Sequence, residues 1–242
     1  MSNVSHQMKP PCYACEKPAT TTEHVPPRCL FPEQKDLPPG ADLRRTLIKV
    51  PSCEEHNLKK SGDDEYLMYV LSMNLPSGVA GQTHFSTKIM RAIQRRPSLA
   101  NRVLSGATPV TLQDPGTGET YETLAIQAEG ERLERVLDMV ALGLYRHHFG
   151  HAWRGALRVI PEFLRFTQEE RAAEWNHAMQ ETTDYANALF GKLRYFGDNP
   201  SIFQYQVVSA TSDAPAAFRM HFYGESRVLS VYGATGGSQE TP

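Results

Sequence analysis

The sequence predicts an α+β protein in which a small zinc-bound module is followed by a mainly helical region with a C-terminal antiparallel β meander. Three observations predict this order. Cysteine and histidine residues at zinc-ligand spacing occur near the N-terminus, a strong helical period fills the middle of the chain, and short aromatic and β-branched runs fill the end. We therefore expect two domains, a zinc-stabilised module over residues 1–72 and an accessory region for substrate or partner binding over residues 73–242.

The composition is that of a folded protein without a membrane-spanning segment. Of 242 residues, 40% are hydrophobic and 21% are charged, as in ordinary globular domains. The formal net charge of −2 argues against a protein that coats nucleic acid by charge alone, but it allows a local cationic surface. No run reaches the roughly 20 apolar residues of a membrane span, and residues 1–9 lack the apolar stretch of a secretory signal. We expect a cytoplasmic protein.

Two ligand pairs near the N-terminus have the spacing of a zinc site. The first is Cys12-x-x-Cys15 and the second is Cys53-x-x-His56, and each spacing suits a turn that points two ligands at one tetrahedral ion. Residues 10–61 are rich in Pro, Cys and charge, so they can hardly bury a core without a metal. The alternative is that two of these residues are ordinary buried side chains, but the second pair favours a closed, structural zinc site.

The middle of the chain predicts helices and a hairpin. A helix over residues 63–75 should end at residues 76–78, which read Pro-Ser-Gly, and a second helix should cover residues 86–94. The Asp-Pro-Gly-Thr-Gly turn at 114–118 lies between two β-type runs. It predicts a β-hairpin over residues 108–127.

The second half predicts two long helices and three strands. Apolar residues at helical spacing over residues 129–147 predict the strongest helix of the chain. Acidic residues early and basic residues late predict another helix over residues 167–193. Aromatic and β-branched runs at 202–208, 217–223 and 227–232 predict the antiparallel meander.

The segment between the two ligand pairs resembles a known nuclease family. It reads Thr21-Thr22-Glu23-His24-Val25-Pro26-Pro27, and Asn57 follows the last ligand, His56. The order C-x-x-C, acidic-His-aliphatic-x-Pro, then C-x-x-H followed at once by Asn resembles the HNH endonucleases, including phage Holliday-junction resolvases. The resemblance covers about residues 10–65. It implies a zinc-stabilised ββα-metal module of the treble-clef type.

The resemblance also implies a catalytic centre of Glu23, His24 and Asn57. A β-hairpin would carry Glu23 and His24, a helix would carry Asn57, and a divalent ion, Mg²⁺ or Mn²⁺, would lie between Glu23 and Asn57. His24 would then be the general base. The chemistry is compatible, because a neutral imidazole can take a proton from water and hard oxygen ligands suit such an ion. The alternative for Glu23-His24 is a surface pair in a loop.

The sequence departs from the family pattern at two places. HNH proteins usually carry an Asn that ties the hairpin loop together, whereas residues 46–48 here read Thr-Leu-Ile, and Thr46 is the candidate to replace it. The first family ligand is more often Asp than Glu. That difference of one methylene shifts the ion without abolishing coordination.

Several cations are candidates for phosphate contacts, although such side chains are often only solvated. They are Arg28, Lys59, Lys60, Lys88, Arg91, Arg95 and Arg96. The acidic residues 63–65 could add a metal contact, but they more simply favour a helix N-terminus. The histidines at 147, 148 and 151 lack Cys or carboxylate companions and are most simply a helix end. Cys29 is most simply a small core residue.

These observations predict a metal-dependent endonuclease that hydrolyses phosphodiester bonds of nucleic acid, DNA rather than RNA by the resemblance alone. The C-terminal region would grip the substrate, bind a protein partner or form a homo-oligomer. The alternative is a non-catalytic zinc module that binds nucleic acid or a protein partner. No motif indicates a separate active site in the C-terminal half.

Overall fold

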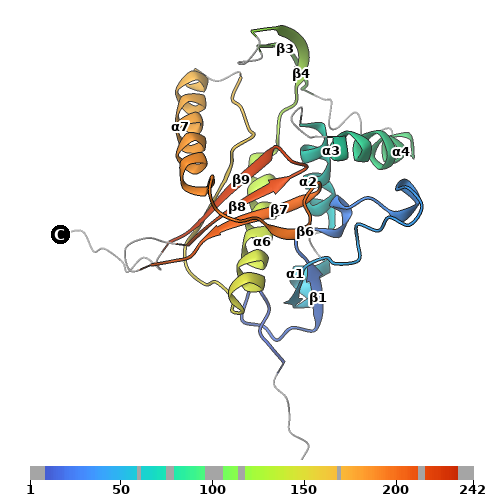
Figure 1. Cartoon of the computed structure of the whole chain (residues 1–242), viewed down its shortest axis with the longest axis vertical. Coiled ribbons are helices and arrows are strands. Elements are labelled where there is room, and N and C mark those ends of the chain that lie inside the picture. Colours follow the sequence, from blue (N-terminus) through green and yellow to red (C-terminus); the bar gives the residue numbers. More distant parts are fainter. Residues whose placement is uncertain are drawn as a thin grey trace, which may run out of the picture.

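The computed structural model of the chain has a mixed α and β architecture (Figure 1). It describes residues 9–58, 61–74, 79–95, 106–113, 118–167, 170–211 and 216–233. A five-stranded antiparallel sheet lies at the centre, one two-stranded hairpin lies near the N-terminus, and a second hairpin stands at the opposite end of the molecule. No described helix combines the length and the apolar character that crossing a bilayer requires.

The central sheet has the strand order β5-β9-β8-β7-β6, and each neighbouring pair is antiparallel. Its strands are β5 (Leu157–Pro161), β6 (Phe196–Asn199), β7 (Phe203–Val208), β8 (Ala216–Phe222) and β9 (Ser226–Tyr232). The last three confirm the predicted meander. Sequence reasoning missed β5 and β6, because each is short and lies at an edge of the sheet. Every residue of β8 is buried, so this central strand is covered on both faces.

One face of the sheet packs on α6 (Gly130–Phe149), which confirms the helix predicted over residues 129–147. The buried apolar side chains of α6 recur at helical spacing. They are Leu133, Val136, Leu137, Val140, Ala141, Leu144 and Tyr145. They share a core cluster with Tyr205, Phe218 and Tyr232 of the sheet. The Tyr232 hydroxyl also donates a hydrogen bond to the Ala141 carbonyl (2.7 Å), which fixes the strand against the helix.

The other face of the sheet carries α7 (Ala172–Phe190), a shorter helix than the one predicted over residues 167–193. A small apolar cluster and a buried polar cluster hold it there. Arg219 of β8 donates to both carboxylate oxygens of Glu162, at 2.9 and 2.5 Å, and to the side-chain oxygen of Asn187 on α7 at 2.8 Å. This face is therefore more polar than the face against α6.

A hairpin and a short helix form the N-terminal unit. Strand β1 (Thr21–His24) pairs antiparallel with β2 (Lys49–Ser52), and His24 faces Lys49 across the pair. Helix α1 (Glu54–Leu58) follows β2 almost directly. Glu23 and His24 therefore lie on a hairpin strand and Asn57 lies on a helix, as the resemblance implies.

The N-terminal unit packs directly on the rest of the molecule. A Cβ added at Gly143 of α6 would lie 2.5 Å from the Val25 side chain, so glycine lets the hairpin approach the helix closely. The Tyr223 hydroxyl donates to the Leu30 carbonyl at 2.8 Å. The domain boundary predicted at residue 72 falls inside α2 (Ser61–Met73), and one core cluster takes side chains from both sides of it.

The middle of the chain contains short helices and the second hairpin. After α2 come α3 (Val79–His84), a π-helical turn η3 (Phe85–Ile89) and α4 (Met90–Arg95), then β3 (Thr108–Gln113) and β4 (Thr120–Ala125). Two 3₁₀ turns, η1 (Arg28–Leu30) and η2 (Gln34–Asp36), precede β2. The predicted hairpin is confirmed, whereas the helical segment predicted over residues 86–94 begins earlier, at Val79. The predicted breaks at 76–78 and 114–117 lie outside the described residues.

Candidate metal centre

Cys12, Cys15, Cys53 and His56 lie together, with their ligand atoms within 4.8 Å of one another. His56 Nδ1 is 3.2 Å from Cys53 Sγ and 3.7 Å from Cys12 Sγ, and the Sγ atoms of Cys15 and Cys53 are 3.7 Å apart. A tetrahedral ion with bonds of about 2.3 Å to sulfur and about 2.0 Å to nitrogen requires ligand separations of roughly 3.5–3.8 Å. The cluster can therefore bind a metal ion such as zinc. The described part of the chain contains no second group of this kind.

The first ligand pair lies in a tight turn closed by its own backbone. Cys12 N donates to Lys17 O at 2.9 Å, and Ala14 N donates to Cys12 Sγ at 3.5 Å. Burial by itself would raise the pKa of Cys12, but hydrogen bonds to the sulfur, the one from Ala14 first, lower it overall. A thiol that ionises more readily is a better metal ligand.

The second ligand pair spans the junction between β2 and α1. Cys53 directly precedes the helix, and three residues along a helix bring His56 back to the same face. Tyr13 N, between the first two cysteines, donates to Pro51 O of β2 at 2.9 Å. This bond joins the turn of the first pair to the strand that leads to the second.

An arginine far along the chain holds the first ligand turn in place. Arg154 Nη2 donates to the carbonyls of Cys12 (2.9 Å) and Cys15 (2.6 Å), and its Nη1 donates to Tyr13 O (3.2 Å). Arg154 lies in the loop between α6 and β5. Sequence reasoning missed this residue, because no local pattern near the cysteines points to a partner in that loop.

The three predicted catalytic residues belong to the hairpin and helix beside the cluster. Asn57 Nδ2 donates to Thr21 Oγ1 at 2.8 Å and to Thr22 O at 3.4 Å, so this side chain lies against β1. Glu23 is buried, with 6% of its surface exposed, and its Oε1 accepts a hydrogen bond from His24 N at 3.0 Å. Because side chains alternate along a strand, Glu23 points to the same face as Thr21 and His24 points to the other.

His24 is half-buried among cations. Burial lowers its pKa first, and the charges of Lys49, Arg28 and Arg44 lower it further. Arg44 is oriented by two bonds to the Phe31 carbonyl, at 3.0 Å from Nε and 2.7 Å from Nη2. These cations make this end of the hairpin attractive to an anion. Sequence reasoning named Arg28 but missed Lys49 and Arg44, although the register of the implied hairpin could have indicated Lys49.

The other predicted phosphate contacts lie in varied settings. Lys88 Nζ donates to Cys29 O at 3.0 Å, and Arg91 forms an ion pair with Asp36 at 2.6 Å, so both cations are engaged within the protein. Arg95 is exposed at the end of α4. Lys59, Lys60 and Arg96 lie outside the described residues.

Two other groups singled out in the sequence have structural contacts. Asp63 accepts a hydrogen bond from Arg132 of α6 at 2.8 Å, and Glu65 accepts one from the Tyr69 hydroxyl at 2.9 Å. His148, near the end of α6, packs among aromatic rings of the sheet. Asp63, Glu65 and His148 are therefore engaged in contacts within the protein.

No protein-family model matches this chain, and neither the curated proteins nor the solved structures contain a match to it. Conclusions about its function therefore depend on the chemistry of its own residues.

Proposed function

We propose that this chain is a metal-dependent endonuclease of the HNH type, which hydrolyses phosphodiester bonds of nucleic acid and prefers DNA to RNA. The observation that carries the proposal is the contact of Asn57 with Thr21 and Thr22. It brings the residue that follows the last cluster ligand against the strand that bears Glu23 and His24. The three candidate groups thus belong to one small unit.

The Cys₃His cluster has a structural role in this proposal. Four protein ligands complete a tetrahedral zinc site and leave no open position for water or substrate. Such an ion would hold the first ligand turn, β2 and α1 together, because these segments supply Cys12, Cys15, Cys53 and His56. The chemistry would then take place at the hairpin.

His24 would accept the proton of the water that attacks the phosphorus atom, because its half-buried ring has a nitrogen suited to that role. The cations Lys49 and Arg28 would attract the phosphate to this end of the hairpin. Glu23 and Asn57 offer the hard oxygen atoms that a Mg²⁺ or Mn²⁺ ion prefers, and the bound ion would neutralise charge on the leaving oxygen. Since Asn57 Nδ2 is bonded to Thr21, the amide oxygen is the atom left for such a ligand.

A plasmid-nicking assay tests the proposal. Purified protein is incubated with supercoiled DNA and Mg²⁺ or Mn²⁺, beside His24→Ala and the control His177→Ala, which removes an exposed histidine of α7. We expect His24→Ala to lower the nicking rate by about 10²- to 10⁴-fold, as loss of a general base does. The control should nick at the wild-type rate.

Each alternative outcome has a defined meaning. Equal nicking by wild type and His24→Ala would remove His24 as the base. If no protein nicks DNA but all of them retard it in a gel, the chain is instead a non-catalytic nucleic-acid-binding module.

A further inference from the structure

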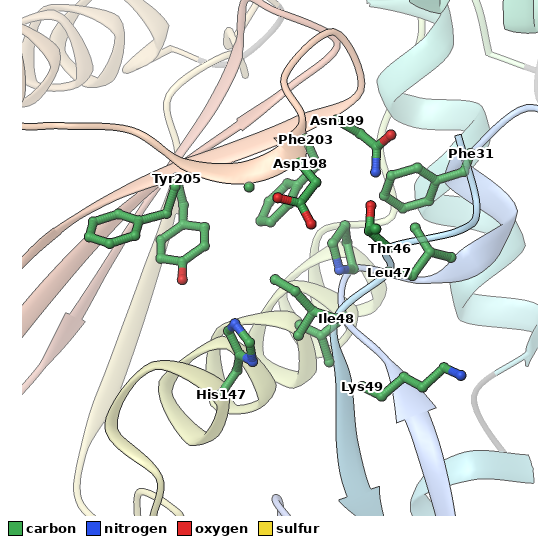
Figure 2. Close-up of a pocket in the computed structure, with 14 residues that line it drawn as sticks. Phe31, Thr46, Leu47, Ile48, Lys49, His147, Asp198, Asn199, Phe203 and Tyr205 are labelled. Atoms are coloured by element: carbon green, nitrogen blue, oxygen red, sulfur yellow. The ribbon is translucent and has the colours of Figure 1, made fainter. Parts of the chain in front are cut away.

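A cavity of about 320 Å³ lies between the turn end of the β1–β2 hairpin, the C-terminal end of α6 and the β6–β7 hairpin (Figure 2). Val25 and Pro26, which directly follow His24, line it. Lys49, which faces His24 across the hairpin, lines it as well. One cation of that end of the hairpin, Lys49, therefore borders the cavity.

The walls of the cavity combine aromatic and aliphatic side chains with polar ones. Figure 2 shows Tyr205 and Phe203 on the sheet side, and Leu47 and Ile48 on the hairpin side. Phe31 closes one end beside Thr46. The aromatic and aliphatic side chains suit a flat aromatic ligand, because its faces lose contact with water when it binds between them.

Besides Lys49 and Tyr205, four polar side chains line the cavity, and none of these four makes a side-chain hydrogen bond or ion pair with a described residue. They are Thr46, His147, Asp198 and Asn199. The Asp198 carboxylate projects into the space between Tyr205 and Ile48 (Figure 2). Asn199 is only 9% exposed and Asp198 is exposed, so both side chains can exchange water for a ligand in the cavity.

The backbone of β6 presents two of these polar groups to the cavity. Gly197 has φ +117°, and a Cβ there would lie 3.0 Å from the Phe203 carbonyl. The register of β6 against β7 shifts between Phe196 and Asn199. Irregularities of this kind redirect side chains at sheet edges, which is where Asp198 and Asn199 stand.

We propose that this cavity binds an unpaired nucleobase that carries an exocyclic amino group, from a strand whose backbone passes Lys49 and His24. The inference rests on the proposed function. A carboxylate accepts hydrogen bonds from amino groups such as cytosine N4, and an amide can donate to or accept from a base edge. Proteins read unpaired bases in this way, by apolar contact with the faces and hydrogen bonds to the edge.

The charge pattern distinguishes a base from a phosphate in this cavity. Asp198 would repel a phosphate, whereas Lys49 at the border would attract one. A nucleotide has a matching distribution of charge, because its base is uncharged and its phosphate is anionic. The base would therefore enter beside Asp198, and the phosphate would stay on the side of Lys49 and His24.

Binding of short single-stranded oligonucleotides tests the inference. Fluorescence anisotropy of labelled oligo(dC) and oligo(dT) is measured on the full chain, with Ca²⁺ in place of Mg²⁺. We expect Asp198→Ala, which removes the acceptor oxygens, to weaken oligo(dC) binding about 5- to 100-fold, as loss of a specific base contact does. Thymine has no amino group, so oligo(dT) binding should be unchanged or tighter.

Two matched variants separate base recognition from charge. Asp184→Ala removes an exposed carboxylate of α7 that accepts from Gln180, and it should change the binding of both oligonucleotides equally. Lys49→Ala should weaken the binding of both oligonucleotides equally. It should also lower the salt dependence of binding by the amount expected for about one phosphate contact.

The outcomes also separate this inference from the proposed cleavage activity. If Asp198→Ala binds both oligonucleotides as tightly as wild type or more tightly, the carboxylate acts only by repulsion and the base site is wrong. Failure of the wild type to bind single-stranded oligonucleotides would also show that the base site is wrong. A selective loss of oligo(dC) binding in a protein that nicks no plasmid would support the base site and contradict the nuclease.

Discussion

The N-terminal unit and the central sheet are stabilised by different means. Residues 10–58 surround four metal ligands with few buried apolar side chains. The sheet instead buries a network of rings around Phe218, which is fully buried. Its ring neighbours are Tyr145, His148, Phe149, Tyr205 and Tyr232. The part that carries the candidate catalytic groups therefore combines its share of the common core with a cluster that could bind a metal ion, whereas the sheet depends on apolar burial.

The largest effect should follow from removal of a cluster ligand. In structural zinc sites on the order of 10 kcal/mol of metal binding is coupled to folding, so Cys53→Ser should lose the metal and most of the order of the N-terminal unit. Metal analysis should find about one zinc per wild-type chain. Limited proteolysis should then cut the variant within residues 10–58 before it cuts the sheet.

Cys29→Ser is the matched control for this prediction. Cys29 also has a free thiol, but it donates a hydrogen bond to Asp64 O at 3.2 Å and lies outside the cluster. It should keep about one zinc per chain. If Cys53→Ser had the same zinc content and protease pattern as this control, the order of the N-terminal unit would not depend on a metal bound by Cys53.

A smaller effect should follow from a cavity in the sheet core. Phe218→Ala should lower the free energy of unfolding by about 3–5 kcal/mol, because the surrounding rings cannot collapse fully into the space. Urea titration measures the change, and Phe218→Leu should cost less than about 1.5 kcal/mol. Variants that remain folded should keep their zinc. Loss of zinc from folded Phe218→Leu would show that the two regions are not stabilised separately.

The smallest of these effects concerns pH. Burial lowers the pKa of His221 to about 4, and the charges of Arg219 and Arg227 add to the effect. In the unfolded chain the same ring titrates near 6.5, so between these values the unfolded state binds more protons. Stability contributed by the neutral ring is present above about pH 6.5 and is lost as pH falls toward 4.

The measurement compares wild type with His221→Gln, which keeps a donor for Gln206 Oε1, the atom 3.3 Å from His221 Nε2. Between about pH 7 and about pH 5, wild type should lose about 2 kcal/mol more than the variant. Urea titration at the two pH values gives the difference. Parallel pH profiles would show that His221 is not buried in its neutral form. Zinc release is common to both proteins and cancels in the comparison.

Much of the fold could be predicted because its signals are local. The helical period of residues 129–147 and the aromatic runs of the meander each lie within one element, and α6 and strands β7–β9 appear where those patterns indicate. The short strands β5 and β6 have no such signal. They are strands because partners elsewhere in the sheet offer them a free edge.

The candidate site likewise has a part that could be predicted from local signals and a part that could not. By itself the sequence determined which four residues form the Cys₃His cluster, since each pair is three residues apart, and its resemblance to HNH endonucleases implied a strand and a helix for Glu23, His24 and Asn57. Only the tertiary structure decided that Arg154 holds the first ligand turn, and that Lys49 faces His24. It also decided that β6 brings Asp198 to the hairpin. The physical reason is distance along the chain: ligand spacing is a property of one turn, whereas these contacts arise only when separate elements pack together.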